Sequence, residues 1–162
     1  LPDLLQAERD IAARLWDLTR YPAPQPKGLE RNIQVLEQAQ GFAYAPYSRF
    51  HVGAALRAKD GRVFKGCNIE NAGYTPTNCA ERTALFKAVS EGVREFDAIA
   101  IVGSKVGEKN TLVTGPCGVC RQALYEFGGP KLTVIMAKDE NDYIVTTLGD
   151  LLPYGFGPAN LE

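Results

Sequence analysis

Histidine is nearly absent from this chain. The 162 residues contain a single one, His51, so no catalytic arrangement that needs a second imidazole can be built. His51 lies far from the cysteine motifs, inside an apolar run that predicts a β-strand. We therefore interpret it as a structural strand residue and expect no Ser/His/Asp or Cys/His triad.

An excess of basic charge is also missing. Lys and Arg together number 18 against 19 Asp and Glu, which gives a formal net charge of −1 and argues against a nucleic-acid partner. Neither an apolar run of membrane-spanning length nor the pattern of a signal peptide is present. We expect a cytoplasmic protein without a membrane partner, in which the 162 residues form one main domain.

Cysteine is scarce as well, but three of the four cysteines fall into two short motifs. Cys79 begins a C-x-E motif, and Cys117 and Cys120 form a P-C-x-x-C motif. Three thiolates can hold Zn²⁺ and leave its fourth position open for water, as in a catalytic zinc site. This usage indicates a metal site rather than a disulfide framework, and a thioredoxin-like redox pair would leave Cys79 and Glu81 unexplained. Cys67 is interpreted as a structural strand thiol outside the cluster.

The periodicity of apolar residues predicts an alternation of helices and strands. Helices are expected over residues 1–20, 29–42, 79–89 and 118–127, and strands over 51–58, 62–69, 97–102, 132–137 and 143–147. After the second helix the order is β-β-α-β-α-β-β, which indicates a three-layer α/β/α fold with a mixed five-strand sheet. The last connection is too short for a crossover helix, so the last two strands should be antiparallel.

Two residues beside the first cysteine complete the chemistry of the predicted site. Both cysteine motifs fall at predicted helix starts, where thiolate is favoured over thiol. Glu81 is close enough to take a proton from water on the zinc and to pass protons on. Arg82 follows Cys79 by three residues, on the same side of the helix, and could offset the net −1 charge of zinc with three thiolates. The alternative interpretations are that Arg82 is a solvated surface arginine and that Glu81 is only an acidic residue at the start of a helix.

These motifs resemble a known family. C-A-E-R-T-A at 79–84 with P-C-G-V-C-R-Q at 116–122 is similar to the zinc-dependent deaminase superfamily. G-C-N-I-E-N-A at 66–72 and Y-S-R-F-H-V-G-A-A at 47–55 resemble the small, homotetrameric cytidine deaminases. The resemblance runs from about residue 29 to the end of the chain, so we divide the chain into an N-terminal helix with a proline-rich linker (1–28) and a deaminase domain (29–162).

The resemblance implies a reaction and a cofactor. The reaction is hydrolytic deamination of cytidine, and of deoxycytidine, to the uridine product and ammonia, a step of pyrimidine salvage. Hydroxide on one zinc ion per subunit would attack C4 of the base while Glu81 shuttles protons. The family also implies a homotetramer whose subunits share their active sites.

The resemblance implies substrate contacts too. Asn68 and Glu70 lie two apart on a predicted strand, so their side chains point to one face and suit a sugar hydroxyl. In the family the matching pair binds the ribose 3′-hydroxyl, which favours a free nucleoside, and the residue matching Phe50 packs on the pyrimidine. Further expected binding positions, three of them in pockets shared between subunits, are Ala72, Tyr74, Ala80 and Phe156.

Three other functions fit the sequence less well. A polynucleotide deaminase usually has histidine as its first ligand and a helix between the last two strands, unlike this chain. Deaminases of blasticidin-like antibiotics share both cysteine motifs but lack the match at 68–72. A non-catalytic zinc-stabilised binding protein would not need Glu81 beside an open ligand position. His51 departs from the family, which often has proline there.

Overall fold

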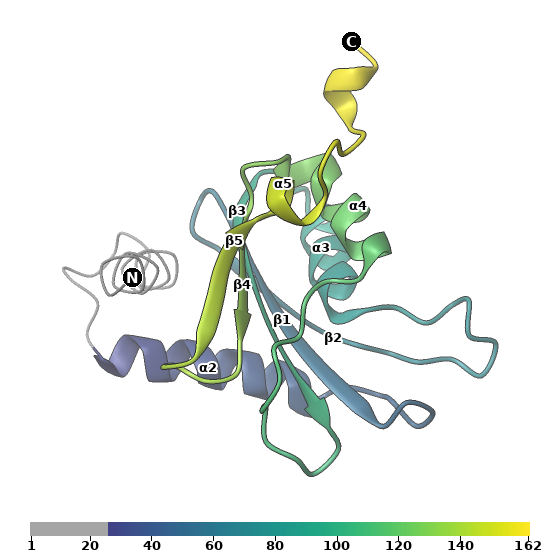
Figure 1. Ribbon diagram of the computed structural model, residues 1–162. Coiled ribbons are helices and arrows are strands. Elements are labelled where there is room, and N and C mark those ends of the chain that lie inside the picture. Colours follow the sequence, from purple (N-terminus) through teal and green to yellow (C-terminus); the bar gives the residue numbers. More distant parts are fainter. Residues whose placement is uncertain (1–25) are drawn as a thin grey trace.

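The computed structural model describes the backbone of residues 26–162 and the side chains from residue 34 onward. The helix predicted over 1–20 lies outside the described residues. In chain order the elements are α2 (Pro26–Gly41), β1 (Phe50–Ala58), β2 (Val63–Cys67), α3 (Ala80–Ser90), β3 (Phe96–Lys105), α4 (Gly118–Gly128), β4 (Thr133–Ala137), β5 (Tyr143–Thr147), α5 (Leu148–Leu151) and the 3₁₀ turn η1 (Pro158–Asn160) (Figure 1).

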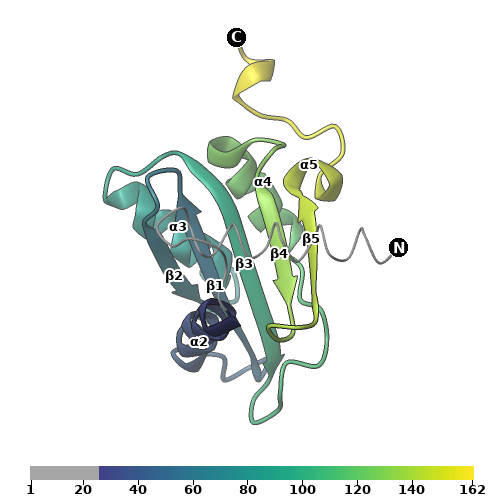
Figure 2. The same ribbon diagram turned by 90° about the vertical axis from the view of Figure 1, so that its left-hand side faces the viewer.

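The strands form one five-strand sheet in the order β2-β1-β3-β4-β5. β1 is antiparallel to both β2 and β3, β3 is parallel to β4, and β4 is antiparallel to β5. The predicted mixed sheet and the antiparallel last pair are therefore confirmed. Helix α2 covers one face, and α3 and α4 cover the other (Figure 2), which makes three layers.

Both faces of the central parts of β1 and β3 are buried, and for this reason residues 52–56 and 98–103 are apolar. On β1, Leu56 and Ala54 pack into the core beneath α3 and α4. Ala55, which points the other way, packs against Leu36 of α2. Period-two alternation thus divides each central strand between two separate cores.

Two glycines let the helices approach the sheet closely. A Cβ at Gly53 of β1 would collide with the backbone of α2 at Leu36. A Cβ at Gly66 of β2 would collide with the backbone of α3 at Ala80 and Ala84. The glycines are required here because a helix backbone occupies the space of a side chain.

Some predicted boundaries were wrong. β2 ends at Cys67 and not at residue 69, so Asn68 and Glu70 lie beyond the strand. After Cys67 the chain leaves β1, and Ile69 instead forms isolated bridges with Tyr44 and with Asn78.

Three further differences concern helices and the third strand. Helix α2 begins at Pro26, inside the segment predicted as a linker, because proline is tolerated in a first helical turn. β3 extends to Lys105, three residues beyond its predicted end. The short helix α5, capped by Thr147, was not predicted. Within residues 26–162, no helix is long and apolar enough to cross a membrane.

Candidate active site

Three cysteines meet where two helices begin. Cys79 is the N-cap residue of α3, Cys117 is the N-cap residue of α4, and Cys120 lies in the first turn of α4. Their sulfur atoms lie within 4.8 Å of one another. The Sγ of Cys117 is 3.8 Å from that of Cys79 and 3.5 Å from that of Cys120.

Sheet topology explains why these helices begin together. Because β1 is antiparallel to both its neighbours, β2 and β3 run in the same direction. Each is followed by a helix on the same face of the sheet, α3 after β2 and α4 after β3. Helices that follow parallel strands begin at the carboxyl edge of the sheet, where ligand sites are usual. Cysteines separated by 38 residues are therefore neighbours.

The three sulfurs fit a zinc ion. Zn–S bonds of about 2.3 Å in a tetrahedron place sulfur atoms about 3.8 Å apart, close to the separations seen here. The thiol of Cys120 donates to Cys79, and this bond, together with donation from Arg82 and Cys117, outweighs burial and lowers the pKa of Cys79 to about 5. The shared proton correspondingly raises the pKa of Cys120. The site thus favours a thiolate, the form that binds zinc.

Glu81 is buried beside this cluster. It lies in the first turn of α3, and the residue is 4% exposed. Burial raises the pKa of its carboxyl group to about 7, and the nearby Cys79 thiolate adds to the increase, against a backbone hydrogen bond and the charge of Arg82. Such a group can both accept and release a proton near neutral pH.

Arg82 contacts the first cysteine as the helical spacing predicts. Its Nη2 donates to the Sγ of Cys79 at 3.5 Å. Its Nε is buried and has no hydrogen-bond partner among the described residues. The guanidinium therefore brings a positive charge against the sulfur cluster.

The sequence of this region is shared with a known family. Residues 27–136 match the family described as "Cytidine and deoxycytidylate deaminase zinc-binding region". The chain belongs to this family. The match covers α2 through β4, including all three cysteines, Glu81 and Arg82.

Individual deaminases are similar over most of their length. The cytidine deaminase of Sporosarcina psychrophila is 47% identical over 134 residues, which are 83% of this chain and 95% of that protein. The crystal structure of cytidine deaminase from Burkholderia pseudomallei has 47% identity and a TM-score of 0.70, over 82% of this chain and 99% of that one. The enzyme from Mycobacterium tuberculosis has 41% identity and a TM-score of 0.66, over 79% of this chain and 98% of that one.

In this deaminase family member, Asn68 is held by the strand next to it. Its Oδ1 accepts from the backbone N–H of Val52, and its Nδ2 donates to the carbonyl of Phe50, both at 2.8 Å. These two bonds determine which end of the amide carries oxygen. One N–H of Nδ2 is left for a ligand, because an amide nitrogen has two donors.

Glu70 is oriented by a neighbouring loop. Its Oε2 accepts from the backbone N–H groups of Tyr47 at 2.8 Å and Ser48 at 3.1 Å. Slight desolvation acts to raise the pKa of Glu70, but the hydrogen bonds from Ser48 and Tyr47 lower it. The carboxylate stays ionised and keeps lone pairs free for a hydroxyl donor.

Phe50 is half-buried, and its ring lies over Gly103 of β3. A Cβ on Gly103 would come within 2.8 Å of the Phe50 ring and 2.6 Å of the Thr114 hydroxyl. Ala80 is fully buried under β2, so its side chain is not available to a ligand and only its backbone could face one.

The other predicted binding residues are exposed. Ala72 and Tyr74 lie in the loop between β2 and α3, where the ring of Tyr74 meets that of Tyr47 edge-on at 6.1 Å. Phe156 lies on the segment that extends beyond α4 and α5 (Figure 1) and is 57% exposed. Among the described residues of the single subunit, none of these three forms a hydrogen bond to the three sulfur atoms.

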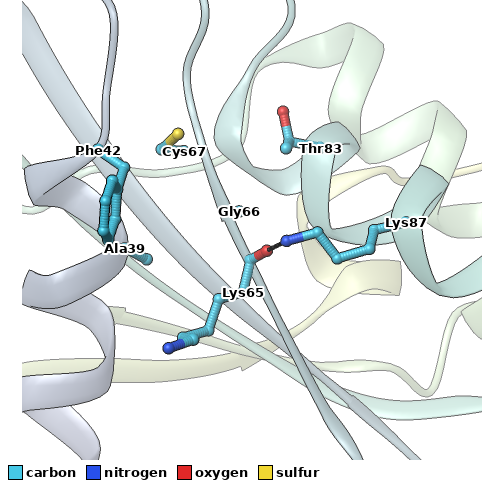
Figure 3. Close-up of a pocket in the computed structure, with 7 residues that line it drawn as sticks. All are labelled: Ala39, Phe42, Lys65, Gly66, Cys67, Thr83 and Lys87. Carbon is cyan, nitrogen blue, oxygen red and sulfur yellow. Dashed lines mark hydrogen bonds between the residues drawn. The ribbon is translucent and has the colours of Figure 1, made fainter.

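Cys67 lies apart from the metal cluster, as predicted. It lines a cavity of about 240 Å³ between α2 and α3, with Lys65 and Lys87 (Figure 3). There the Lys87 ammonium donates to the Lys65 carbonyl oxygen. Burial raises the pKa of the Cys67 thiol, although Lys87 acts in the opposite direction.

Two positioning residues were missed. The Nδ2 of Asn78 donates to the hydroxyl of Thr83 at 3.1 Å. The same hydroxyl donates to the carbonyl of Cys79 at 3.2 Å. Together they brace the backbone of the first cysteine. The only signal in the sequence was the polar character of both residues.

Proposed function

We propose that this chain catalyses the hydrolytic deamination of cytidine, and of deoxycytidine, to uridine or deoxyuridine and ammonia. The observation that carries the proposal is the buried carboxyl group of Glu81 beside three converging sulfurs, in a chain that belongs to the deaminase family. Held by Cys79, Cys117 and Cys120, zinc supplies Lewis-acid activation of a water molecule.

Glu81 moves the protons in this proposal. Its carboxylate takes one proton from the attacking water and delivers it to N3 of the ring, and then takes the second proton from the hydroxyl on C4 and delivers it to the leaving amine. A pKa near 7 suits both tasks, because neither protonation state is strongly favoured at neutral pH. Its burial keeps these transfers away from bulk water.

Arg82 corrects the charge of the site. Three thiolates would leave zinc with a net charge of −1, which makes activation of water harder. The guanidinium at Cys79 withdraws electron density from that sulfur through a charge-assisted hydrogen bond.

Asn68, Glu70 and Phe50 select a free nucleoside. The free N–H of Asn68 donates to a sugar hydroxyl, and the carboxylate of Glu70 accepts from one. A pair of groups that encloses the 3′-hydroxyl disfavours a polynucleotide, in which that oxygen is esterified. The ring of Phe50 provides a flat apolar surface for the pyrimidine.

We further propose that the enzyme is a homotetramer in which Ala72, Tyr74 and Phe156 enter a neighbouring subunit's pocket. Their exposure in the single subunit supports this assignment, and the backbone of Ala80 would face the substrate. Residues 29–162 would form the catalytic unit, with 1–28 as an accessory. Cysteines used as metal ligands rather than disulfides suit a cytoplasmic enzyme of pyrimidine salvage.

One assay tests the proposal. Cytidine mixed with the zinc-loaded protein should lose its absorbance within minutes as it becomes uridine. Glu81→Gln should keep its zinc and lose about 10²- to 10⁴-fold in kcat, because it cannot carry a proton. Unchanged turnover in this variant would remove Glu81 from its role. Binding of cytidine without turnover would indicate a binding protein, and turnover of a cytosine-containing oligonucleotide would indicate a polynucleotide deaminase.

A further inference from the structure

Arg121 joins two segments that are far apart in the sequence. Its Nε donates to the carbonyl of Pro116 at 2.7 Å, and its Nη1 donates to the carbonyl of Leu151 at 2.7 Å. Pro116 directly precedes the metal ligand Cys117, and Cys120 directly precedes Arg121. A single guanidinium therefore fastens the second cysteine motif to the C-terminal part of the chain.

The residues after Arg121 strengthen this connection. The Nε2 of Gln122 donates to the carbonyl of Phe156 at 2.8 Å. The ring of Tyr125 lies so close to Gly155 and Gly157 that a Cβ on either would come within 2.8 Å and 2.7 Å of it, respectively. We call residues 151–157 the C-terminal arm. The arm is held along its length by side chains of one helix, α4.

The arm presents exposed rings on a held backbone. Phe156 is 57% exposed and Tyr154 is fully exposed, although the carbonyl of Phe156 is hydrogen-bonded. Tyr154 has a φ of 56°, a left-handed conformation that is unfavourable for a tyrosine. The contacts of the arm with Arg121, Gln122 and Tyr125 compensate for this cost. The direction of the arm is therefore fixed by α4.

We propose that Arg121 is a positioning residue with two separate effects, on the metal ligands through Pro116 and on the arm through Leu151, whereas Gln122 acts on the arm alone. This inference rests on the proposed function. The two hydrogen bonds of the Arg121 side chain go to Pro116 and Leu151, and neither goes to a predicted zinc ligand or to a residue predicted to bind the substrate. It acts by fixing the peptide that leads into Cys117 and the segment that carries Phe156.

The two effects predict different kinetics. Arg121→Ala should lower kcat and raise KM, each about tenfold, because loss of a charge-assisted hydrogen bond loosens both ends. Gln122→Ala should raise KM by about tenfold and leave kcat within about twofold, because only the arm is released. Arg94→Ala removes an exposed arginine from the loop before β3 and serves as the matched control.

A spectroscopic measurement separates the two effects without any substrate. With Co²⁺ in place of zinc, the thiolate-to-cobalt absorption bands report the geometry of the sulfurs. These bands should shift in Arg121→Ala and match the parent in Gln122→Ala and Arg94→Ala. Hydrogen exchange at the amides of Leu152 and Gly155 should be about tenfold faster in both Arg121→Ala and Gln122→Ala.

Several results would overturn the inference. Parent-like cobalt bands in Arg121→Ala would remove its effect on the metal ligands, and parent-like exchange of the arm would remove its effect there. Equal cobalt shifts in Gln122→Ala would contradict the division of roles. If Arg121→Ala does not fold, Arg121→Lys, which keeps the charge but only one of the two bonds, should lose one effect and retain the other. Failure of the proposed function would appear instead as an inactive parent with normal cobalt bands.

Discussion

Individual side chains in this protein derive their chemistry from what surrounds them. Glu81 would be an ordinary surface acid if exposed, but burial raises its pKa to about 7. The side-chain amide of Asn68 forms two hydrogen bonds with the backbone of β1, and one N–H of its Nδ2 is left free for a ligand. Burial sets the pKa of Glu81, and hydrogen bonds set the orientation of Asn68, before any substrate is present. This reduces the reorganisation that catalysis requires.

Arg82 provides a test at this scale. Arg82→Gln should lower zinc affinity or kcat by about 10- to 100-fold, because the Cys79 sulfur loses its charged hydrogen-bond donor. Zinc content and turnover are the measurements, with Arg94→Gln as a control for the loss of one positive charge. Unchanged values of both would assign Arg82 to the solvated surface.

Glu70 gives a prediction that depends on pH. Its pKa is lower in the folded protein than in the unfolded chain, so its contribution to stability is present at neutral pH. That contribution should disappear as the pH falls below about 4.3, the usual range of a free glutamate, through the lower folded pKa. Glu70→Gln should therefore be less stable than the parent at pH 7, and the gap should close in acid. Urea unfolding across this range measures it, and a gap independent of pH would contradict the hydrogen-bonding role.

The residues of the metal site could be predicted because their spacing is local. A C-x-E motif and a P-C-x-x-C motif are read directly from the chain, and Arg82 at i+3 from Cys79 follows from helical geometry. The burial of Glu81 could not be predicted in this way, since it depends on how α3 packs against the sheet. Nor could the bracing of Cys79 by Asn78 and Thr83.

The helices and strands position these residues through close contact. Gly66 is the clearest example, since α3 lies so near β2 that no Cβ fits between them. The strand that precedes Asn68 is thereby held against the helix that begins after Cys79. This contact brings the predicted sugar-binding segment next to the metal ligands.

Gly66→Ala should separate these two elements. The added Cβ would meet the backbone of α3, which cannot move aside as a flexible side chain could, so we expect a loss of about 1–3 kcal/mol in the free energy of unfolding. Turnover should fall as well, because Cys79 and Asn68 would move apart. Thermal unfolding measures the first effect. Gly41→Ala, where nothing lies within 4 Å of the added Cβ, is the control and should melt like the parent.

Element types were predicted well, and their ends less well. The predicted ranges of β1, α3 and α4 agree with the structure to within about one residue at each end. The end of β2 was missed because residue 69 is apolar and continues the pattern, while its actual partners, Tyr44 and Asn78, come from other segments. Pairing between distant segments leaves no local signal.

At the scale of the whole molecule, two exposed aromatic residues lie on segments outside the sheet and its covering helices. Tyr74 and Phe156 lie on the loop after β2 and on the C-terminal arm, and both are more than half exposed. Exposed aromatic side chains of this kind are typical of contacts with other molecules. The proposed homotetramer would cover them and complete each pocket.

Mixing of variant subunits tests this arrangement. Phe156→Ala should raise KM by about tenfold through loss of an aromatic contact with substrate. Mixed with Glu81→Gln subunits, it should regain turnover, because some sites then combine an intact Glu81 with an intact Phe156 from a neighbour. Subunits that carry both substitutions should give no gain. The absence of regained turnover in mixed assemblies would place Phe156 at its own subunit's site or at none.

Local motifs of the chain were enough to predict the zinc ligands, the proton carrier, the order of the elements and the family, because each motif consists of residues close together in the chain. How these parts meet depends on the tertiary structure. The parallel directions of β2 and β3 bring Cys79 and Cys117 together, and packing buries Glu81. Side chains of α4 direct the C-terminal arm. These features depend on contacts between residues tens of positions apart, which no local pattern records.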